Sequence, residues 1–335
     1  MNGARATVVV ITHNRRAELL TTLRHMTSLP DRMPIVVVDN GSADGSADMA
    51  EREFGAQVIR NAQNRGFCAA NNQGIAAARG EYIALLNNDA EAEPNWLAEL
   101  QRACASGPRI GMAASKVLVW EDPTRIDKAG HLMFPDGQNR GRGSGMPDRG
   151  QFDLQEEVLW PDGCAAMYRK LMLDEIGGFD EDFFAYGDDA ELGLRARIAG
   201  WQCMYAPGAV VRHHRGATLG KDSGWRLHLI ERNRVLLAVK LFPWSLLALN
   251  PFYYAIRLVG GAMLARGNRG DTAHFPGIAG KLTILKALAH GDLAALRLVP
   301  RMLRKRAGIR RLSRLTPAEI RRLLLAHRLS LSEVA

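Results

Sequence analysis

Cysteine is scarce in this sequence, with four residues in 335, no CxxC pair and no dense framework. This pattern argues against a disulfide scaffold or a structural zinc module and favours a reducing compartment. Long apolar runs are also lacking: charges and prolines interrupt the most apolar stretch, residues 235–264, before it reaches the roughly 20 residues that cross a bilayer. No signal-peptide pattern follows Met1, so we expect a cytoplasmic protein.

Acidic residues are rare in the last third of the chain. Residues 226–335 contain 20 Lys and Arg against five Asp and Glu, a net charge of +15, whereas residues 1–225 contain 24 against 30, a net charge of −6. The overall composition, 47% hydrophobic and 24% charged, is that of a globular protein. We therefore predict a catalytic domain over 1–225 and a basic helical region over 226–335 that meets an anionic surface.

Two hydrophobic periods alternate over the first 120 residues. Apolar runs rich in β-branched residues predict strands at 7–12, 35–39, 56–60 and 82–86, and such runs suit strands buried on both faces of a parallel sheet. Helical patterns occupy 16–26, 46–54, 67–78 and 94–105. This order predicts an α/β fold with a Rossmann-like, mostly parallel sheet flanked by helices and joined by right-handed crossovers.

Polar side chains follow all four predicted strands. The strand ends read Thr-His-Asn at 12–14, Asp-Asn-Gly-Ser at 39–42, an Asn- and Gly-containing turn at 61–66, and Asn-Asn-Asp at 87–89. Ligands of such sheets bind beyond the carboxyl ends of the strands. Four polar ends in series therefore predict one shared pocket.

The middle of the chain has little regular pattern. Residues 120–152 are rich in Gly, Pro, Asp and Arg and predict either a long mobile loop over the active site or a low-complexity linker. Order is expected to return at 157–170, and a helix is expected at 188–199, ending at Gly200.

The C-terminal region predicts contact with a membrane surface. Five aromatic residues of the kind found at headgroup level lie within 235–264, and residues 301–328 combine ten Arg and Lys with leucines at helical spacing. Together they predict peripheral association with the inner face of the cell membrane. The alternative is a helical hairpin buried against the catalytic domain with a solvated basic face.

Six segments at this order and spacing resemble one known family. They are VVVITHNR (8–15), VVVDNGSADGS (36–46), NRGFCAANNQGI (64–75), YIALLNNDAE (82–91), GGFDEDFFAYGDDAELGLRARIAGW (177–201) and HHRGATLG (213–220). Over about residues 7–219 the chain resembles a family 2 glycosyltransferase of the GT-A fold, in the branch similar to bacterial rhamnosyltransferases. The resemblance implies inverting transfer of a sugar, with rhamnose from a dTDP donor as the best candidate. A hydroxyl of a lipid-linked saccharide in cell-envelope polysaccharide biosynthesis is the expected acceptor.

The resemblance also implies a donor pocket at the strand ends. Asp39 corresponds to the residue that contacts a uracil or thymine base, and a carboxylate can accept a hydrogen bond from the ring N–H; an Asx turn onto the next helix is the alternative. The N-terminus of the helix after Arg65 is expected to bind the donor diphosphate, because helix N-termini attract anions. The alternative is that Asn64 only caps this helix. The predicted donor-binding residues are Thr12, Asn14, Asp39, Asn64, Arg65, Gly66, Asn71, Asn87 and Asn88.

Asn87-Asn88-Asp89 stands in the place of the family's DxD motif, with Asn at the first acidic position. A divalent cation, Mg²⁺ or Mn²⁺, prefers oxygen ligands, so the resemblance implies a metal on Asp89, with Glu91 nearby. The missing first acid weakens the expected site, and an Asx turn is the alternative for Asp89. Relatives use a histidine near the position of His213 and His214 to complete the metal shell. We favour His214 as this ligand, and His213 is the alternative. Beyond them, Arg215 and Lys221 are candidates to screen the leaving diphosphate.

Asp188 and Asp189 begin a predicted helix after an aromatic turn. Adjacent carboxylates raise each other's affinity for a proton, and a base near neutral pH is what removes a proton from an acceptor hydroxyl. The family's Glu-Asp pair appears here as Asp-Asp. The resemblance implies that Asp189 is the catalytic base and that Asp188 orients or contacts the acceptor. Stabilisation of the helix N-terminus by both carboxylates is the alternative.

Three other functions share parts of this pattern. A sugar-nucleotide pyrophosphorylase normally has a Gly-rich basic loop after the first strand, where this chain reads THNRR. A nucleic-acid-binding protein would explain the basic tail, but no nucleic-acid module motif is present, and leucines rather than stacking aromatics separate the basic residues. A non-catalytic nucleotide-sugar binder is disfavoured because both Asp89 and Asp189 are retained. The pattern does not predict an oligomeric state.

Overall fold

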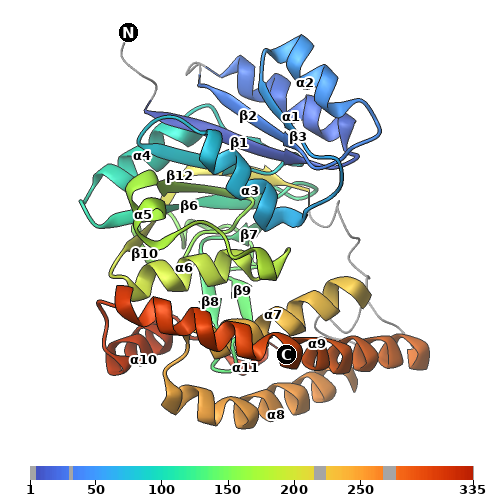
Figure 1. The fold of residues 1–335 in the computed structure, drawn as a ribbon, viewed down its shortest axis with the longest axis vertical. Coiled ribbons are helices and arrows are strands. Elements are labelled where there is room, and N and C mark those ends of the chain that lie inside the picture. The colour runs from blue at the N-terminus through green and yellow to red at the C-terminus, as the bar shows by residue number, and fades with distance from the viewer. Residues whose placement is uncertain (1–4, 30–32, 215–223, 267–276, 335) are drawn as a thin grey trace. The chain divides into compact units, whose positions relative to one another are not determined.

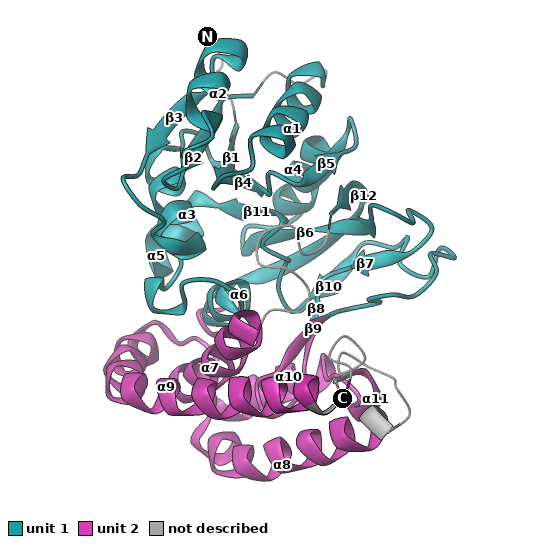
Figure 2. Cartoon of the chain, turned by 90° about the vertical axis from the view of Figure 1, so that its right-hand side faces the viewer, with its two compact units in different colours: residues 1–131, 141–197, 201–215 teal, residues 132–140, 198–200, 216–335 magenta. Residues whose placement is uncertain are grey.

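The computed structural model describes residues 5–29, 33–214, 224–266 and 277–334, and Figure 1 shows their fold. The chain forms two compact units: residues 1–131, 141–197 and 201–215, and residues 132–140, 198–200 and 216–335 (Figure 2). The elements in chain order are β1 (Ala6–Thr12), α1 (Arg16–Ser28), β2 (Ile35–Asp39), α2 (Ser46–Phe54), β3 (Gln57–Arg60), α3 (Gly66–Ala77), β4 (Tyr82–Leu86), β5 (Ala90–Ala92), α4 (Trp96–Ala105), β6 (Ile110–Val119), β7 (Ile126–Lys128), β8 (His131–Met133), β9 (Asn139–Gly141), β10 (Glu156–Val158), β11 (Ala165–Arg169), α5 (Lys170–Ile176), a 3₁₀ turn (Glu181–Phe183), α6 (Asp188–Ile198), β12 (Gln202–His213), α7 (Gly224–Leu241), α8 (Trp244–Arg266), α9 (Gly277–Leu312), α10 (Pro317–Ala326) and α11 (Leu331–Val334).

The first unit is built on a ten-stranded sheet. Its strand order is β10-β12-β6-β11-β4-β1-β2-β3, with β5 paired to β12 and β7 paired to β6. The strands β4, β1, β2 and β3 are parallel, as the sequence predicts, and β12 is parallel to β6. Every pair made by β5, β7, β10 and β11 is antiparallel, so the sheet as a whole is mixed.

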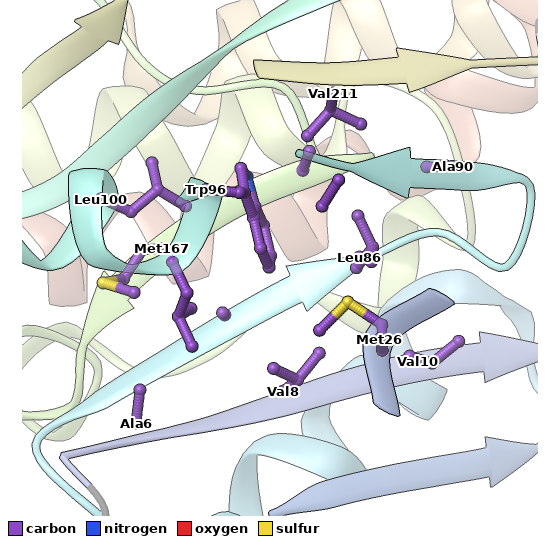
Figure 3. Close-up of a cluster of buried hydrophobic side chains, with 14 of the residues drawn as sticks. Ala6, Val8, Val10, Met26, Leu86, Ala90, Trp96, Leu100, Met167 and Val211 are labelled. Atoms are coloured by element: carbon purple, nitrogen blue, oxygen red, sulfur yellow. The ribbon is translucent and has the colours of Figure 1, made fainter. Parts of the chain in front are cut away.

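A continuous apolar core holds the strands and helices of this unit together. Figure 3 shows side chains from β1, β4, α1 and α4 meeting in one cluster, with Trp96 among them. Trp96 is fully buried, and its indole N–H donates to Ser115 Oγ at 2.8 Å, so the one polar atom of the ring has a partner. The strand ends that carry the polar residues are therefore fixed by a rigid interior.

Residues 120–152 form ordered structure rather than the loop or linker that their composition predicts. They contain β7, β8 and β9, and five glycines with positive φ make the turns between or beside these strands: Gly130, Gly137, Gly143, Gly145 and Gly150. Several polar side chains here are buried, including Asp127 and Asp136, both 0% exposed. The composition of this segment is typical of a solvated loop, yet the segment contains buried ion pairs. Hydropathy alone does not distinguish such buried charged residues from surface residues.

The basic stretch 301–328 is two helices rather than one. The helix α9 ends at Leu312, and α10 starts at Pro317 after a capping box in which the Thr316 and Glu319 side chains bond each other's backbone N–H. In α10, Ile320 and Leu324 are buried. None of the described helices combines the length and hydrophobicity needed to cross a membrane.

A buried ion cluster holds the second unit together. Arg257 pairs with Asp136 and, at 2.9 Å, with Glu231, while Arg234 pairs with Glu231 at 2.6 Å. Asp136 is 0% exposed and Glu231 1% exposed. Removing one partner of such a cluster leaves the other charges buried without compensation.

We predict that Asp136→Ala lowers the free energy of unfolding by about 3–5 kcal/mol, because Arg257 would lose its buried counter-charge. Urea denaturation followed by circular dichroism measures the change. Asp48→Ala is the matched control, since it removes a carboxylate that pairs with Arg60 in an exposed position and should cost below about 1 kcal/mol. Equal midpoints for the two variants would contradict the role assigned to the cluster.

Candidate active site

The sheet topology gathers the polar strand ends at one edge. Thr12 and Asp39 are register partners at the ends of β1 and β2, and Asn88, beyond β4, donates to Thr12 Oγ1 at 3.1 Å. Because β11 runs antiparallel to β4, its first residues lie at this same edge, where the Asn87 N–H donates to the Cys164 carbonyl at 2.8 Å. The predicted pocket therefore has contributions from strands far apart in the sequence.

Asp39 and Asn14 shape the loop after β2. Asp39 is 5% exposed, and its Oδ1 accepts the Ser42 N–H at 3.2 Å, a local bond that reaches one residue further than the Asx turn considered above. Asn14 has a left-handed backbone with φ of 52° and accepts the Ala43 N–H on Oδ1 at 2.8 Å. The two side chains hold the loop 39–43 against the end of β1.

An asparagine that the sequence analysis did not select, Asn40, organises the start of α3. Its Oδ1 accepts the Arg65 N–H at 3.0 Å, and its Nδ2 donates to Asn64 Oδ1 at 2.9 Å. Asn64 in turn accepts the Gly66 N–H at 2.9 Å, so its local capping role is present. The Arg65 side chain is exposed, whereas Asn71 is buried and donates to the Phe67 carbonyl of its own helix at 3.0 Å.

The aromatic turn before α6 packs onto this same helix start. Gly66 has φ of +84°, and a side chain at this position would collide with the ring of Phe184. The Phe184 carbonyl accepts the Cys68 N–H at 3.1 Å. Phe184 and Tyr186 both have left-handed φ values, 64° and 68°, and such conformations persist only where the surroundings enforce them. The first residue of α6, Asp188, is thereby held beside the start of α3.

The buried carboxylate of Asp89 faces His213. Asp89 is 8% exposed, its Oδ1 makes no hydrogen bond within the described part of the chain, and the same atom lies 3.4 Å from His213 Nε2. His213 Nδ1 lies 3.1 Å from Asp127 Oδ2. Burial lowers the pKa of His213, but the neighbouring Asp127 and Asp89 carboxylates outweigh it and raise the pKa to about 9. A buried carboxylate oxygen without a hydrogen bond fits a metal ligand.

The other two residues predicted for the metal lie differently. The His214 ring stacks on Trp120 with centroids 4.0 Å apart, and its backbone N–H donates to the Asp89 carbonyl at 3.0 Å. Glu91 is paired with Arg212 across β5 and β12, while Ala90 is paired with His213. Since side chains alternate along a strand, Glu91 lies on the face opposite to His213. The predicted Arg215 and Lys221 lie outside the described residues.

Asp189 lies in a second cluster of buried charges. Its Oδ2 accepts the Gly163 N–H at 3.4 Å and lies 3.6 Å from His131 Nε2. His131 Nε2 is also 2.9 Å from Asp162 Oδ2, which pairs with the Lys128 ammonium. Residues 128, 131 and 162 were not selected from the sequence.

Burial and neighbouring charge shift the pKa values of these acids in opposite directions. Burial would raise the pKa of Asp162, but the Lys128 and His131 charges hold it well below the ordinary value. Burial raises the pKa of Asp189, with the charge of His131 acting against the rise. Burial and the Asp189 charge together raise the pKa of Asp188 well above its ordinary value. Carboxylates whose pKa values are driven apart in one cleft are a usual sign of acid–base chemistry.

The ligand atoms of His131, Asp162 and Asp189 lie within 4.8 Å of one another, a spacing that also suits a cation. At Asp162, however, the Lys128 ammonium already provides positive charge. Asp89 Oδ1, which has no hydrogen bond within the described part of the chain, is a second position that could receive a cation.

The strand β7 connects the two clusters. Asp127 contacts His213, and the next residue, Lys128, contacts Asp162. The pairing of β7 with β6 is irregular here: Ile126 and Lys128 have partners on β6, and Asp127 between them has none. The contacts of Asp89 and those of Asp189 thus meet at two adjacent residues of β7. These residues were missed because 120–152 was interpreted as a loop; Asp162 had a usable signal, as it immediately precedes a buried strand at the active edge.

Comparisons with known proteins place the chain in a family. The family model described as glycosyl transferase family 2 matches residues 7–177, just over half of the chain. A Sinorhizobium fredii protein named "Uncharacterized protein y4gI" is 30% identical over 209 residues, 56% of this chain but only 22% of that protein. The N-acetylglucosaminyl-diphospho-decaprenol L-rhamnosyltransferase of Mycobacterium tuberculosis is 25% identical over 64% of this chain and 78% of that enzyme.

The solved structure of GalNAc-T7 with UDP, GalNAc and Mn²⁺ matches 89% of this chain and 56% of that one, with a TM-score of 0.61 and 16% identity. At this identity the likeness concerns the fold, which is the predicted GT-A fold of glycosyltransferases. With the family match over the strands that form the site, it follows that the chain belongs to glycosyl transferase family 2 and is a glycosyltransferase.

Proposed function

We propose that this glycosyltransferase transfers a sugar from a nucleoside diphosphate to a hydroxyl of a lipid-linked saccharide, with inversion at the anomeric carbon. The observation that carries the proposal is that the contacts of Asp89 and those of Asp189 end on adjacent residues of β7, Asp127 and Lys128. One end offers a cation site and the other a base, which are the two functions that a single-displacement transfer requires.

The donor is assigned to the strand ends at β1, β2 and β4. Asp39, with Thr12 and Asn14 beside it, would receive a uracil or thymine base, and the start of α3 with Arg65 would receive the diphosphate. Asn87 and Asn88 adjoin the cation position; the other assigned donor residues are Asn64, Gly66 and Asn71. Rhamnose is our preferred sugar, because the M. tuberculosis relative is named a rhamnosyltransferase.

Asp89 and His213 are the residues that would hold a divalent cation, Mg²⁺ or Mn²⁺, and its binding would displace the proton that His213 holds near neutral pH. A cation bound there supplies positive charge to a diphosphate leaving group. His213 is preferred to His214 because its ring faces Asp89, whereas the ring of His214 stacks on Trp120. Glu91 remains a weaker candidate because of its place on the opposite face of β5.

Asp189 is assigned the role of the base that takes the proton from the acceptor hydroxyl. A raised pKa brings its carboxylate closer to the range in which it can accept a proton from a hydroxyl near neutral pH. The Gly163 N–H fixes one of its oxygens at 3.4 Å. Asp188, directly before it, is assigned to orienting the acceptor, and holding both reactants in one geometry does much of the work.

The C-terminal region supports the choice of a lipid-linked acceptor. The relative from M. tuberculosis is named for an acceptor linked to decaprenol through a diphosphate, and residues 226–335 carry a net charge of +15. Both support a lipid-linked saccharide acceptor and peripheral association of this region with an anionic membrane surface on the cytoplasmic side.

We predict that Asp189→Asn lowers the transfer rate by about 10²–10⁴-fold, because the amide cannot accept the hydroxyl proton, while donor affinity stays within about twofold. Release of nucleoside diphosphate measures turnover, and calorimetric titration measures donor binding. The control is Asp174→Asn, which changes an exposed carboxylate of α5. A variant at 189 with wild-type turnover would show that another group is the base.

We predict that His131→Asn moves the acid limb of the pH–rate profile to higher pH. The positive charge of His131 opposes the rise in the pKa of Asp189, so its removal raises that pKa further, and Asp189 then stays protonated to a higher pH. Transfer rates between pH 4 and 8 measure the shift. A purely structural role for His131 would lower the rate without moving the limb.

We predict that Asp89→Asn and His213→Gln each weaken Mn²⁺ binding by at least about tenfold. His214→Gln is the matched control and should leave Mn²⁺ affinity within about twofold, since its ring stacks on Trp120. Electron paramagnetic resonance of free Mn²⁺ measures the affinity without requiring turnover. A larger effect at 214 than at 213 would reverse the assignment of the two histidines.

A further inference from the structure

Helix α8 exposes a face that carries no charge. Between residues 244 and 263, every exposed side chain is large and apolar or is Ala, Ser or Pro. The largest are Trp244 at 58% exposed, Phe252 at 62%, Val259 at 55% and Met263 at 65%. They are spaced by eight, seven and four residues, close to whole helical turns, and so form a stripe along the helix. Isolated exposed apolar residues are normal, but an uncharged stripe of five turns marks an interaction surface.

The opposite face of α8 fixes this orientation. Arg257 points inward to Asp136 and Glu231, and the Tyr254 hydroxyl donates to Asp292 on α9 at 2.9 Å. A surface helix ordinarily buries its apolar side and exposes its charges, and α8 does the reverse. Turning the stripe inward would break the buried ion pairs of Arg257 with Asp136 and Glu231, so these pairs hold the stripe outward.

Positive charge accompanies this apolar surface on α9 of the same unit. The helix contains nine Lys and Arg and one acid, Asp292, and that acid is engaged by Tyr254. Along α9, exposed leucines such as Leu285 and Leu296 alternate with exposed Lys286 and Arg297. Apolar and cationic groups without exposed acids complement an anionic lipid surface.

We propose that α8 lies in the headgroup plane of an anionic bilayer, with the stripe that contains Phe252 and Val259 in contact with lipid and the basic residues of α9 on headgroup phosphates. This refines the membrane association proposed above and rests on the lipid-linked acceptor of the proposed function. It also places the apolar lipid contact on α8 rather than on α10, where Ile320 and Leu324 are buried.

Vesicle flotation tests the proposal with the full chain and vesicles of phosphatidylcholine containing about 30% phosphatidylglycerol. We expect wild-type protein to float, and the double variant Phe252→Glu, Val259→Glu to bind at least about tenfold more weakly. The matched control, Leu154→Glu, Leu171→Glu, adds the same charge at two exposed leucines of the first unit and should bind within about twofold of wild type. Failure of wild type to float, or equal binding of the two double variants, would overturn the proposal.

A second readout needs no added charge. Trp244 and Trp225 are both exposed, at 58% and 52%, so a Trp225→Phe protein reports chiefly on Trp244 as the exposed indole. Its fluorescence should shift to shorter wavelength with anionic vesicles, with a smaller shift on pure phosphatidylcholine because the phosphate attraction is missing. An unchanged spectrum would overturn the lipid contact even if the double variant failed to fold.

Light scattering separates the lipid face from a chain–chain interface. A dimer that the α8 double variant breaks, combined with no vesicle binding, would assign the stripe to a second copy of the chain and overturn the proposal. Nucleoside diphosphate release without vesicles separates the inference from the proposed function, since the α8 variant should retain it. Vesicle binding without any donor turnover would overturn the function and leave the lipid face standing.

Discussion

Several buried carboxylates are held at one edge of the sheet, and the candidate active site depends on how they are held. Asp89, Asp127, Asp162, Asp188 and Asp189 are all at or near the interior of the first unit. So many acids would repel one another in a medium of low dielectric constant unless cations lay between them. Lys128, His131 and His213 occupy those positions. The remaining negative charge is what a divalent cation or a transferable proton can relieve.

The topology explains why such distant residues meet. Parallel strands present their carboxyl ends at one edge, and the antiparallel β11 brings its beginning to the same edge. The turn before α6 then has to approach the start of α3, which the lack of a side chain at Gly66 permits. The two ends of the site therefore depend on different structural features: strand register on the side proposed for the donor, and a strained turn packed against a glycine on the side proposed for the acceptor.

Local periodicity sufficed to predict the first four strands and their polar ends, to which the donor is assigned by proposal, because each depends on a short run of residues. Residues 120–152 could not be predicted in this way. Asp127 and His131 are buried and Lys128 is partly buried, and their partners His213 and Asp162 are distant in the sequence. The choice between His213 and His214 likewise depends on strand alternation and on stacking with Trp120, whereas the capping box at Thr316 was a local signal that would have divided 301–328 into two helices.

The central claim is that a cation at Asp89 and a base at Asp189 serve one pocket. Anomalous diffraction from a crystal grown with Mn²⁺ and a nucleoside diphosphate tests it most directly. The account predicts one anomalous peak within about 2.5 Å of the Asp89 carboxylate, with Asp189 facing the same cavity at a distance of about one sugar and its diphosphate, below roughly 15 Å. A peak centred instead between His131, Asp162 and Asp189, with none at Asp89, would contradict it.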